Sequence, residues 1–310
     1  MSKANFNELL DAGCHFGHLK RKWNPNMAPY IFMERNGIHI IDLYKTIAKI
    51  EEAAEAMTQI AKSGKKILFV ATKKQAKEIV ATHVKKVGMP YVTERWPGGM
   101  LTNFATIRKA VRKMSTIDKM MNTSSYTSLS KRERLQVTRE RAKLEKNLGS
   151  IADLSRLPSA LFVVDILKEH IAIAEAKKLN IPTFAIVDTN SDPNLVDFPI
   201  PANDDASKSI SLILSIMTQA IEEGLNDRKL DKDKQSDDDD QMENDEEGTT
   251  LKTLAEIAAE EEERAARKAK KELKPIKLGD EAEVATELPD GIKAGKKTVV
   301  KRPTIKRQII

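Results

Sequence analysis

The chain has 310 residues, enough for two ordinary domains or for one domain with extensions. Charged residues reach 32%, aromatic residues only 5%, and the formal net charge is +6, a balance typical of proteins that face polyanions rather than of compact enzymes. The only cysteine, Cys14, excludes an internal disulfide, and no apolar run is long enough to span a bilayer. The first residues lack a signal peptide's apolar stretch, so we expect a cytoplasmic protein.

Residues 1–37 are predicted to form a short helix, Phe6 to Leu10, followed by an arm without regular structure. The arm contains two prolines and two glycines among many polar residues. It also holds His15, His18, the three successive cations of residues 20–22 and Trp23. Cations near phosphates release counterions, and flat rings stack on unpaired bases, so the arm is a candidate RNA contact. Trp23 serves equally well as an anchor of the arm on the domain.

An α/β core is predicted in residues 38–101 and 150–224. Its strands are short, near-continuous apolar runs separated by helices, a pattern that favours a parallel sheet covered on both faces. The predicted elements, in chain order, are an apolar run Ile38–Ile41, a helix Thr46–Lys62, a strand Lys66–Ala71, a helix Gln75–Lys86, strands at 161–166 and 183–188 flanking a helix Glu169–Leu179, and a last helix Ile210–Ile221.

Residues 102–149 are predicted to form an inserted antiparallel helical hairpin, made of helices Thr102–Met121 and Leu129–Leu148. Sparse apolar positions in each helix, Leu135 among them, would form one narrow seam. The two helices hold twelve Lys or Arg against four Asp or Glu. A charge run is usually a solvated face, but this sign bias on a projection favours RNA contact. The candidate cations are Arg108, Lys109, Arg112, Lys113, Lys131, Arg132, Arg134 and Arg139.

The segment ERWPGGMLTN at 94–103 combines a cation with a tryptophan, as the arm does: Arg95 and Trp96 stand beside a Pro-Gly-Gly turn. Its glycines permit positive φ and close approach of the backbone. We therefore expect a structural role for Gly98 and Gly99, and an RNA contact from Arg95 and Trp96.

Residues 225–310 are predicted to be a charged, largely flexible C-terminal tail. An acidic stretch comes first, then a helix-prone segment and a basic end. The acidic stretch would screen the basic core from nonspecific RNA, or the basic end would reach a neighbouring protein or RNA segment.

Signals for catalysis are weak. Asp165 and Asp188 follow predicted parallel strands, where open α/β sheets bind ligands, and with Asp192, Asp204 and Asp205 they could hold magnesium. The alternative, which we favour, is that these aspartates cap helices and turns. Phosphate-binding glycine motifs are absent, and Cys14, His15 and His18 lack the second ligand pair of a zinc site. We expect no catalytic residue, metal or cofactor; an enzyme using the strand-end aspartates and an adaptor acting through the tail remain as alternatives.

Several long segments, in one order, resemble the family of bacterial small-subunit ribosomal protein two, the S-two family. The matching segments cover about residues 1–225 and are LLDAGCHFGHLKRKWNPNMAPYI at 9–31, RNGIHIIDLYKT at 35–46, LFVATKKQA at 68–76, RWPGGMLTNFATI at 95–107, VVDILKEHIAIAEAKKLNIP at 163–182 and IVDTNSDPNLVDFPIPANDDASKSI at 186–210. Two positions depart from the family: Cys14 replaces a small aliphatic residue, and Ala202 stands where glycine is expected.

The resemblance implies a flavodoxin-like, doubly wound parallel sheet that bears a helical coiled-coil projection. It implies a structural, non-catalytic protein that binds 16S-type rRNA at the junction of the head and body of the small subunit. It also implies neighbouring small-subunit proteins as partners, including the S-one protein, which it helps to recruit, with no membrane and no small-molecule substrate. By position, the implied RNA contacts are the hairpin cations together with His15, His18, Lys20, Arg21, Lys22, Trp23, Asn24, Arg95 and Trp96.

Overall fold

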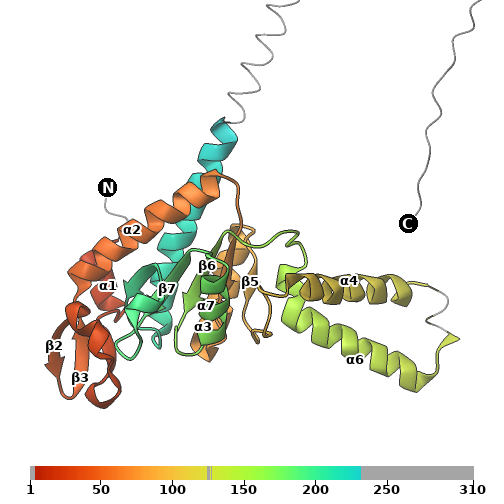
Figure 1. Ribbon diagram of the computed structural model, residues 1–310, viewed down its shortest axis with the longest axis horizontal. Helices are drawn as coiled ribbons and strands as arrows, with labels where there is room; N and C mark the ends of the chain where they lie inside the picture. Colours follow the sequence, from red (N-terminus) through yellow and green to blue (C-terminus); the bar gives the residue numbers. More distant parts are fainter. Residues whose placement is uncertain (1–3, 124–125, 127, 232–310) are drawn as a thin grey trace, which may run out of the picture. The chain divides into compact units, whose positions relative to one another are not determined.

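The computed structural model describes residues 4–123, residue 126 and residues 128–231 (Figure 1). Most of the predicted C-terminal tail, residues 232–310, lies outside the described residues. Among those that are described, no helix is both long and apolar enough to cross a lipid bilayer.

A five-stranded parallel sheet forms the centre of the fold. Its strands are β4 (Ile67–Val70), β5 (Tyr91–Val92), β6 (Ala160–Val164), β7 (Thr183–Val187) and β8 (Phe198–Pro201), in the spatial order β5-β4-β6-β7-β8. Counted within the sheet this is the order 2-1-3-4-5, which is that of flavodoxin-like folds. The predicted parallel sheet is therefore confirmed, and two short edge strands that the sequence analysis did not identify, β5 and β8, complete it.

Both faces of the sheet are covered, because alternate residues of each strand pack on opposite sides. One side packs against α2 (Leu43–Lys62), α3 (Lys74–Lys86) and the helix of residues 207–231. The other side packs against α7 (His170–Lys178) and the loop of residues 96–101. All side chains of β4, β6 and β7 are buried, which explains the continuous apolar runs in the sequence.

The predicted helix near the N-terminus is confirmed as α1 (Phe6–Asp11), but the prediction of an irregular arm is wrong. The arm folds into a three-stranded antiparallel sheet of β1 (Phe16–Leu19), β2 (Ile31–Arg35) and β3 (Ile38–Ile41), in the order β1-β3-β2. Two 3₁₀ helices, η1 (Lys20–Lys22) and η2 (Pro25–Tyr30), connect β1 to β2. Asn36 and Gly37, with φ of 53° and 72°, turn β2 into β3, a conformation that favours this residue pair in tight hairpins.

The helical hairpin consists of α4 (Phe104–Met121) and α6 (Lys131–Leu148), and it extends away from the parallel sheet (Figure 1). Ser130 and Glu133 form a reciprocal capping box that fixes the start of α6. Met114 and Ile117 are buried in the seam, as is Leu148 at its base. Leu135, which we expected in the seam, is 50% exposed.

The last described helix, residues 207–231, continues past the predicted boundary at residue 225. It lies close against α2: the hydroxyl of Thr58 donates to the carbonyl of Ala220 at 3.1 Å, and a Cβ at Gly224 would come within 2.4 Å of the Thr58 carbonyl oxygen. Lys62 and Asp231 form an ion pair at 3.1 Å across the same two helices. The helix that packs on α2 therefore continues to residue 231, although its last core contact is made by Leu225.

Candidate RNA-binding surface and charge cluster

The N-terminal arm is fastened to the carboxyl end of β7. The backbone N–H of His18 donates to the hydroxyl of Thr189, and that of Asn24 to the Thr189 carbonyl, both at 2.8 Å. Gly17 is needed here, because a Cβ on it would lie 2.6 Å from the Thr189 methyl carbon. The arm is thus held as a fixed surface rather than a free segment.

The predicted contact residues of the arm lie in different environments. Arg21 and Lys22 are exposed, whereas Lys20 forms an ion pair with Glu34 at 2.7 Å. Trp23 is 37% exposed, and its ring centroid lies 5.2 Å from that of the buried His39. One part of the indole is therefore anchored and another is open, so both roles considered for Trp23 are compatible with the structure.

Two further predicted contact residues of the arm, Asn24 and His15, make contacts within the protein. The side-chain oxygen of Asn24 accepts from the N–H of Asn26 at 2.9 Å and caps η2. His15 is half-buried, its ring lies 4.0 Å from that of Phe16, and burial lowers the pKa of His15. His15 is consequently neutral near pH 7.

A cluster of charged groups fills the carboxyl edge of the parallel sheet. Lys73, which follows β4, lies 2.9 Å from Asp204, 2.7 Å from Asp205 and 3.4 Å from Asp165. Although burial opposes its charge, hydrogen bonds to Asp205 and Asp204 raise the pKa of Lys73. Asp165 adopts φ +72°, a strained value for a non-glycine residue, and its carboxylate accepts from the Lys168 N–H at 3.2 Å.

His18 belongs to this cluster rather than to an exposed RNA-facing strip. Its Nδ1 lies 3.0 Å from Asp188 and its Nε2 lies 3.5 Å from Asp205. The contact with Asp188 raises the pKa of His18, against the effect of burial. Asp204 is fully buried and lies beside Asp188 and Asp165, so its pKa is raised to about 7. One oxygen of Asp204 has no hydrogen-bond donor among the described residues.

The predicted capping role of the aspartates is confirmed in part. Asp192 caps the 3₁₀ helix η4 (Pro193–Leu195) through the N–H of Asn194 at 3.0 Å. Before the last helix, however, Asn203 accepts from the N–H groups of residues 205 and 206, and Asp204 and Asp205 bind Lys73 instead.

Three members of the cluster have the geometry to hold a metal ion. His18, Asp188 and Asp204 each offer one ligand atom, and these atoms all lie within 4.8 Å of one another. One imidazole nitrogen and two carboxylate oxygens suit a borderline divalent cation such as zinc. Cys14 does not take part, because it is fully buried in the core beside Ser209. In the sequence, His18 stands with Cys14 and His15, far from Asp188 and Asp204, so the three ligands were expected in two separate candidate sites.

The two RNA contacts predicted in the loop of residues 94–103 differ in their exposure. Arg95 is exposed, whereas Trp96 is only 7% exposed and donates its indole N–H to Glu175 at 3.2 Å. The ring of Trp96 packs in the core, so it is not available to stack on a base. Gly99 has φ +83°, as the expected structural role of the turn requires.

The hairpin cations divide into engaged and free groups. Arg108 donates to the carbonyls of residues 154 and 155, Lys113 pairs with Glu140, and Arg134 is half-buried. The remaining exposed cations have no acidic partner in the part of the chain that the structure describes; they are Lys109, Arg112, Lys119, Lys131, Arg132, Arg139 and Lys143.

The acidic residues of the hairpin are all engaged. Asp118 and Glu145 bind Arg141, Glu140 binds Lys113, and Glu133 caps α6 through Ser130. Only Glu133 carries a charge that no cation pairs with, and the seven free cations outweigh it, so the exposed surface of the hairpin is strongly positive.

An exposed apolar hollow of about 230 Å³ lies between α1, the small sheet and the start of α2. Leu10, Phe32, Met33 and Tyr44 line it and are 43%, 69%, 48% and 73% exposed. The rings of Phe6 and Tyr44 lie 5.0 Å apart, so these side chains form one contiguous patch. No sequence pattern marks this patch, because each of its apolar residues could equally well be a core position.

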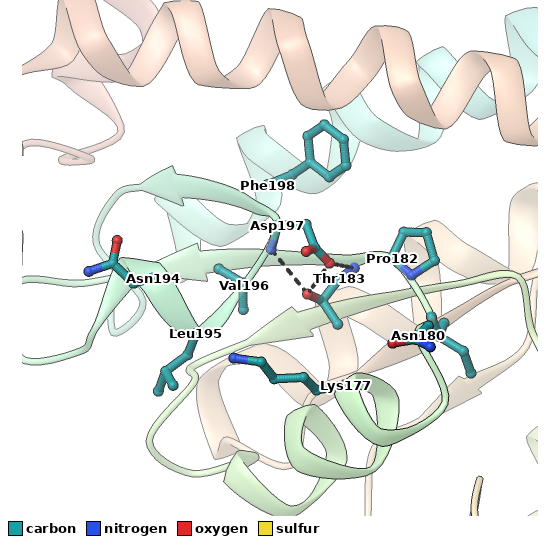
Figure 2. A pocket seen from close by; sticks show the side chains of 10 residues that line it. Lys177, Asn180, Pro182, Thr183, Asn194, Leu195, Val196, Asp197 and Phe198 are labelled. Carbon is teal, nitrogen blue, oxygen red and sulfur yellow. Dashed lines mark hydrogen bonds between the residues drawn. The ribbon is translucent and has the colours of Figure 1, made fainter.

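A second cavity, of about 420 Å³, opens at the amino ends of β7 and β8, away from the charge cluster (Figure 2). Thr183 and Asp197 satisfy each other there: the Asp197 carboxylate accepts from the N–H and hydroxyl of Thr183 at 2.9 Å, and the Asp197 N–H donates to that hydroxyl at 3.2 Å. Lys177 is the only cation among the residues that line the cavity. These groups do not form a recognisable chemical site.

Two residues at the centre of these arrangements were not singled out from the sequence. Lys73 comes two residues after the strand run KILFVA, so the strand-end rule that identified Asp165 and Asp188 could also have found it. Glu175 sits in an ordinary charged helix, and nothing in its sequence context marks it as buried.

Comparison with known proteins agrees with these features. The family model described as ribosomal protein S2 matches residues 9–224. Small ribosomal subunit protein uS2 of Phocaeicola vulgatus is 72% identical over 232 residues, which are 75% of this chain and 83% of that protein. The proteins of the same name from Bacteroides thetaiotaomicron and Flavobacterium johnsoniae are each 71% identical, over 75% and 76% of this chain and 84% and 92% of their own lengths. The chain therefore belongs to the ribosomal protein S2 family.

Proposed function

We propose that this chain is a structural, non-catalytic protein of the small ribosomal subunit that binds small-subunit rRNA and neighbouring ribosomal proteins. The names of its relatives support the assignment to the small subunit. The observation that carries the RNA-binding part is the charge segregation of the hairpin, where the acids are engaged internally and seven cations are free. As a bacterial ribosomal component it would act in the cytoplasm.

The hairpin and the arm would contribute differently to RNA binding. The free hairpin cations are long side chains on helices, suited to phosphates along an RNA backbone. In the arm, Arg21 and Lys22 are exposed and directly precede the partly exposed Trp23 in the chain, a combination suited to a phosphate next to an unpaired base. Arg95 is exposed in the loop that leads into the hairpin and would add a further phosphate contact. Trp96 is buried and His18 is bound by Asp188 and Asp205, so neither belongs to this proposed RNA surface.

Salt dependence of RNA binding tests this proposal. A variant with Arg112, Arg132 and Arg139 changed to glutamine should bind a small-subunit rRNA fragment more weakly. The slope of log K against log salt concentration should fall in magnitude by roughly two to three, since each lost phosphate contact contributes about 0.7–0.9. The matched control changes Lys65, Lys85 and Lys86, three exposed cations of the core, to glutamine. Equal slopes for the two variants would refute RNA binding by the hairpin.

The site at the head–body junction is the finer part of the proposal. Incorporation into subunits, followed by hydroxyl-radical cleavage of rRNA from a probe tethered at Ser115 of α4, would show which RNA the hairpin approaches. Cleavage confined to RNA of the junction is expected. Cleavage elsewhere would contradict this placement without affecting RNA binding itself.

We also propose that the chain helps to recruit the S-one protein, and that the apolar hollow is its contact surface. Contiguous exposed apolar side chains at a hollow, rimmed by polar residues, are a feature of protein interaction sites. Phe32 and Tyr44, the two most exposed aromatic residues of the patch, would be the anchors.

Subunits carrying Phe32→Ser and Tyr44→Ser should retain less S-one protein after sedimentation through a sucrose gradient. The control variant carries Leu167→Ser and Ile171→Ser, which remove comparable exposed apolar side chains elsewhere. Normal retention of S-one by the first variant would refute this contact, and loss of S-one from both variants would show a nonspecific effect.

A further inference from the structure

Glu175 of α7 is a buried carboxylate whose partners all come from one loop. Its side chain is 8% exposed and forms no ion pair within the described part of the chain. One oxygen accepts from the N–H of Gly99 at 2.7 Å and from the indole of Trp96 at 3.2 Å. The other accepts from the N–H groups of Leu101 and Thr102 at 2.9 and 3.1 Å, and from the Thr102 hydroxyl at 3.3 Å.

Such convergence of successive backbone N–H groups on a carboxylate forms an anion-binding nest built from the protein's own loop. Burial favours the neutral acid, but the donors from the loop prevail and lower the pKa of Glu175. The ionised form is required, because both oxygens act only as acceptors. A glutamine in this position would turn an N–H₂ group toward N–H donors and leave them unsatisfied.

The loop held by Glu175 leads directly into the hairpin. It ends at Asn103, and α4 begins at Phe104 without a side-chain cap on its first turn. Phe104 and Ile107 at the base of α4 pack against the same apolar cluster as Trp96, Met100 and Leu101. The direction in which α4 leaves the core therefore depends on the position of this loop.

The ion pairs at the hairpin base are more exposed. Glu94 lies 3.2 Å from Lys77 and 3.4 Å from Lys146, and all three side chains are about a third exposed or more. Exposed ion pairs of this kind contribute little to rigidity. The buried hydrogen bonds of Glu175 therefore fix the loop that enters the hairpin more firmly than these ion pairs do.

We propose that Glu175 is a positioning residue for RNA binding: it holds the 96–102 loop so that the hairpin presents its free cations in a fixed direction from the core. This inference rests on the proposed RNA-binding function of the hairpin and adds the element that orients it. Glu175 does not itself touch RNA, since its side chain is buried beneath the loop.

The test measures the orientation of the hairpin directly. Spin labels on cysteines introduced at Ser115 of α4 and at Glu55 of α2, both exposed, report the hairpin-to-core distance distribution in the full-length protein. The native Cys14 is fully buried, and burial raises the pKa of its thiol, so it stays unlabelled. Glu175→Gln should broaden this distribution while the far-UV helix signal is retained.

RNA affinity is measured in parallel on the same rRNA fragment. Glu175→Gln should weaken binding by about threefold or more, whereas Glu78→Gln, the same change at an exposed site of α3, should alter neither distance nor affinity. An unchanged distance distribution and unchanged affinity for a folded Glu175→Gln protein would overturn the inference. If that variant does not fold, the double variant Trp96→Phe and Thr102→Ala, which removes two of the five donors, decides by the same two readouts.

The two proposals fail in distinguishable ways. If the triple hairpin variant binds RNA normally, the hairpin is not an RNA-binding element and the proposed function fails. If the triple variant binds weakly while Glu175→Gln binds normally with an unbroadened distance distribution, only the positioning role of Glu175 is refuted.

Discussion

Replacing Asp204 by asparagine should stabilise the protein at alkaline pH and change it little at acidic pH. The pKa of Asp204 is raised from 3.8 to about 7, because its carboxyl is buried and lies beside Asp188 and Asp165. Between these pH values the folded protein holds a proton that the unfolded chain releases. The free energy of unfolding therefore falls as pH rises through this range, and a neutral asparagine removes that part of the dependence.

The size of the effect follows from the same values. One pKa unit corresponds to about 1.4 kcal/mol, so the rise from 3.8 to about 7 sets an upper limit of roughly 4 kcal/mol on the gain of Asp204→Asn above pH 7. At pH 5 roughly 1.6 kcal/mol of this gain should already be present, because the unfolded carboxyl ionises above 3.8, and the gain should vanish only below that pH. The asparagine oxygen can still accept from Lys73, and its amide can donate to a neighbouring carboxylate, so no new unsatisfied group is expected.

Urea unfolding at pH 5, 6, 7 and 8 in the presence of a chelator measures this difference, the chelator removing any cation held by His18, Asp188 and Asp204. Asp205→Asn should change stability in the opposite direction. Burial raises the pKa of Asp205, but Lys73 lowers it by more, so the Asp205→Asn variant should be less stable than the parent at neutral pH. A pH-independent difference between Asp204→Asn and the parent would refute the reasoning.

Three further substitutions test the packing around the site. Lys73→Met should cost about 3–5 kcal/mol in urea unfolding at pH 7, because it leaves buried carboxylates uncompensated; a near-neutral result would contradict the ion cluster. Gly17→Ala should lower the melting temperature, since the new methyl group would collide with Thr189; an unchanged temperature would mean that the arm can shift. Phe162→Ala should cost about 3–5 kcal/mol at the centre of the sheet, as chemical denaturation would show.

The interior of the sheet could be predicted from the sequence because a strand that is buried on both faces appears as a continuous apolar run. β4, β6 and β7 have no exposed residue, and each reads as an unbroken apolar run. β8 has no such apolar run. Its sequence FPIP contains two prolines, which are tolerated only because the strand lies at the sheet edge. β5 has two residues, too few for any periodicity.

The N-terminal sheet was missed for a different reason. β2 is half-buried at Ile31 and exposed over its other four residues, so the alternation expected of a strand is absent. Both strand pairs also contain a shift of register, which breaks any pattern of period two. The Asn36-Gly37 pair was the usable signal, because this dipeptide between apolar runs is typical of a tight hairpin.

The candidate site could be predicted residue by residue but not as an arrangement. Exposed cations such as Arg112 and Arg132 stay where their sequence places them, on helix surfaces. Whether a cation is free depends on partners far along the chain, as with Lys20 and Glu34, or Lys113 and Glu140. The roles of Trp96 and Glu175 are set by a contact between residues 79 positions apart, which no local pattern records.

The distribution of charge explains how one fold serves binding without catalysis. The carboxyl edge of the sheet, where open α/β folds place their substrates, is filled by Lys73 and three carboxylates held against one another. On the hairpin the reverse holds, because its few acids are engaged and its excess cations reach solvent. Charges that neutralise one another stabilise the fold, whereas charges without a partner are free to bind an external polyanion. Engineering an acidic partner for Arg132, for example by Gln136→Glu one helical turn later, should therefore weaken RNA binding without changing the melting temperature.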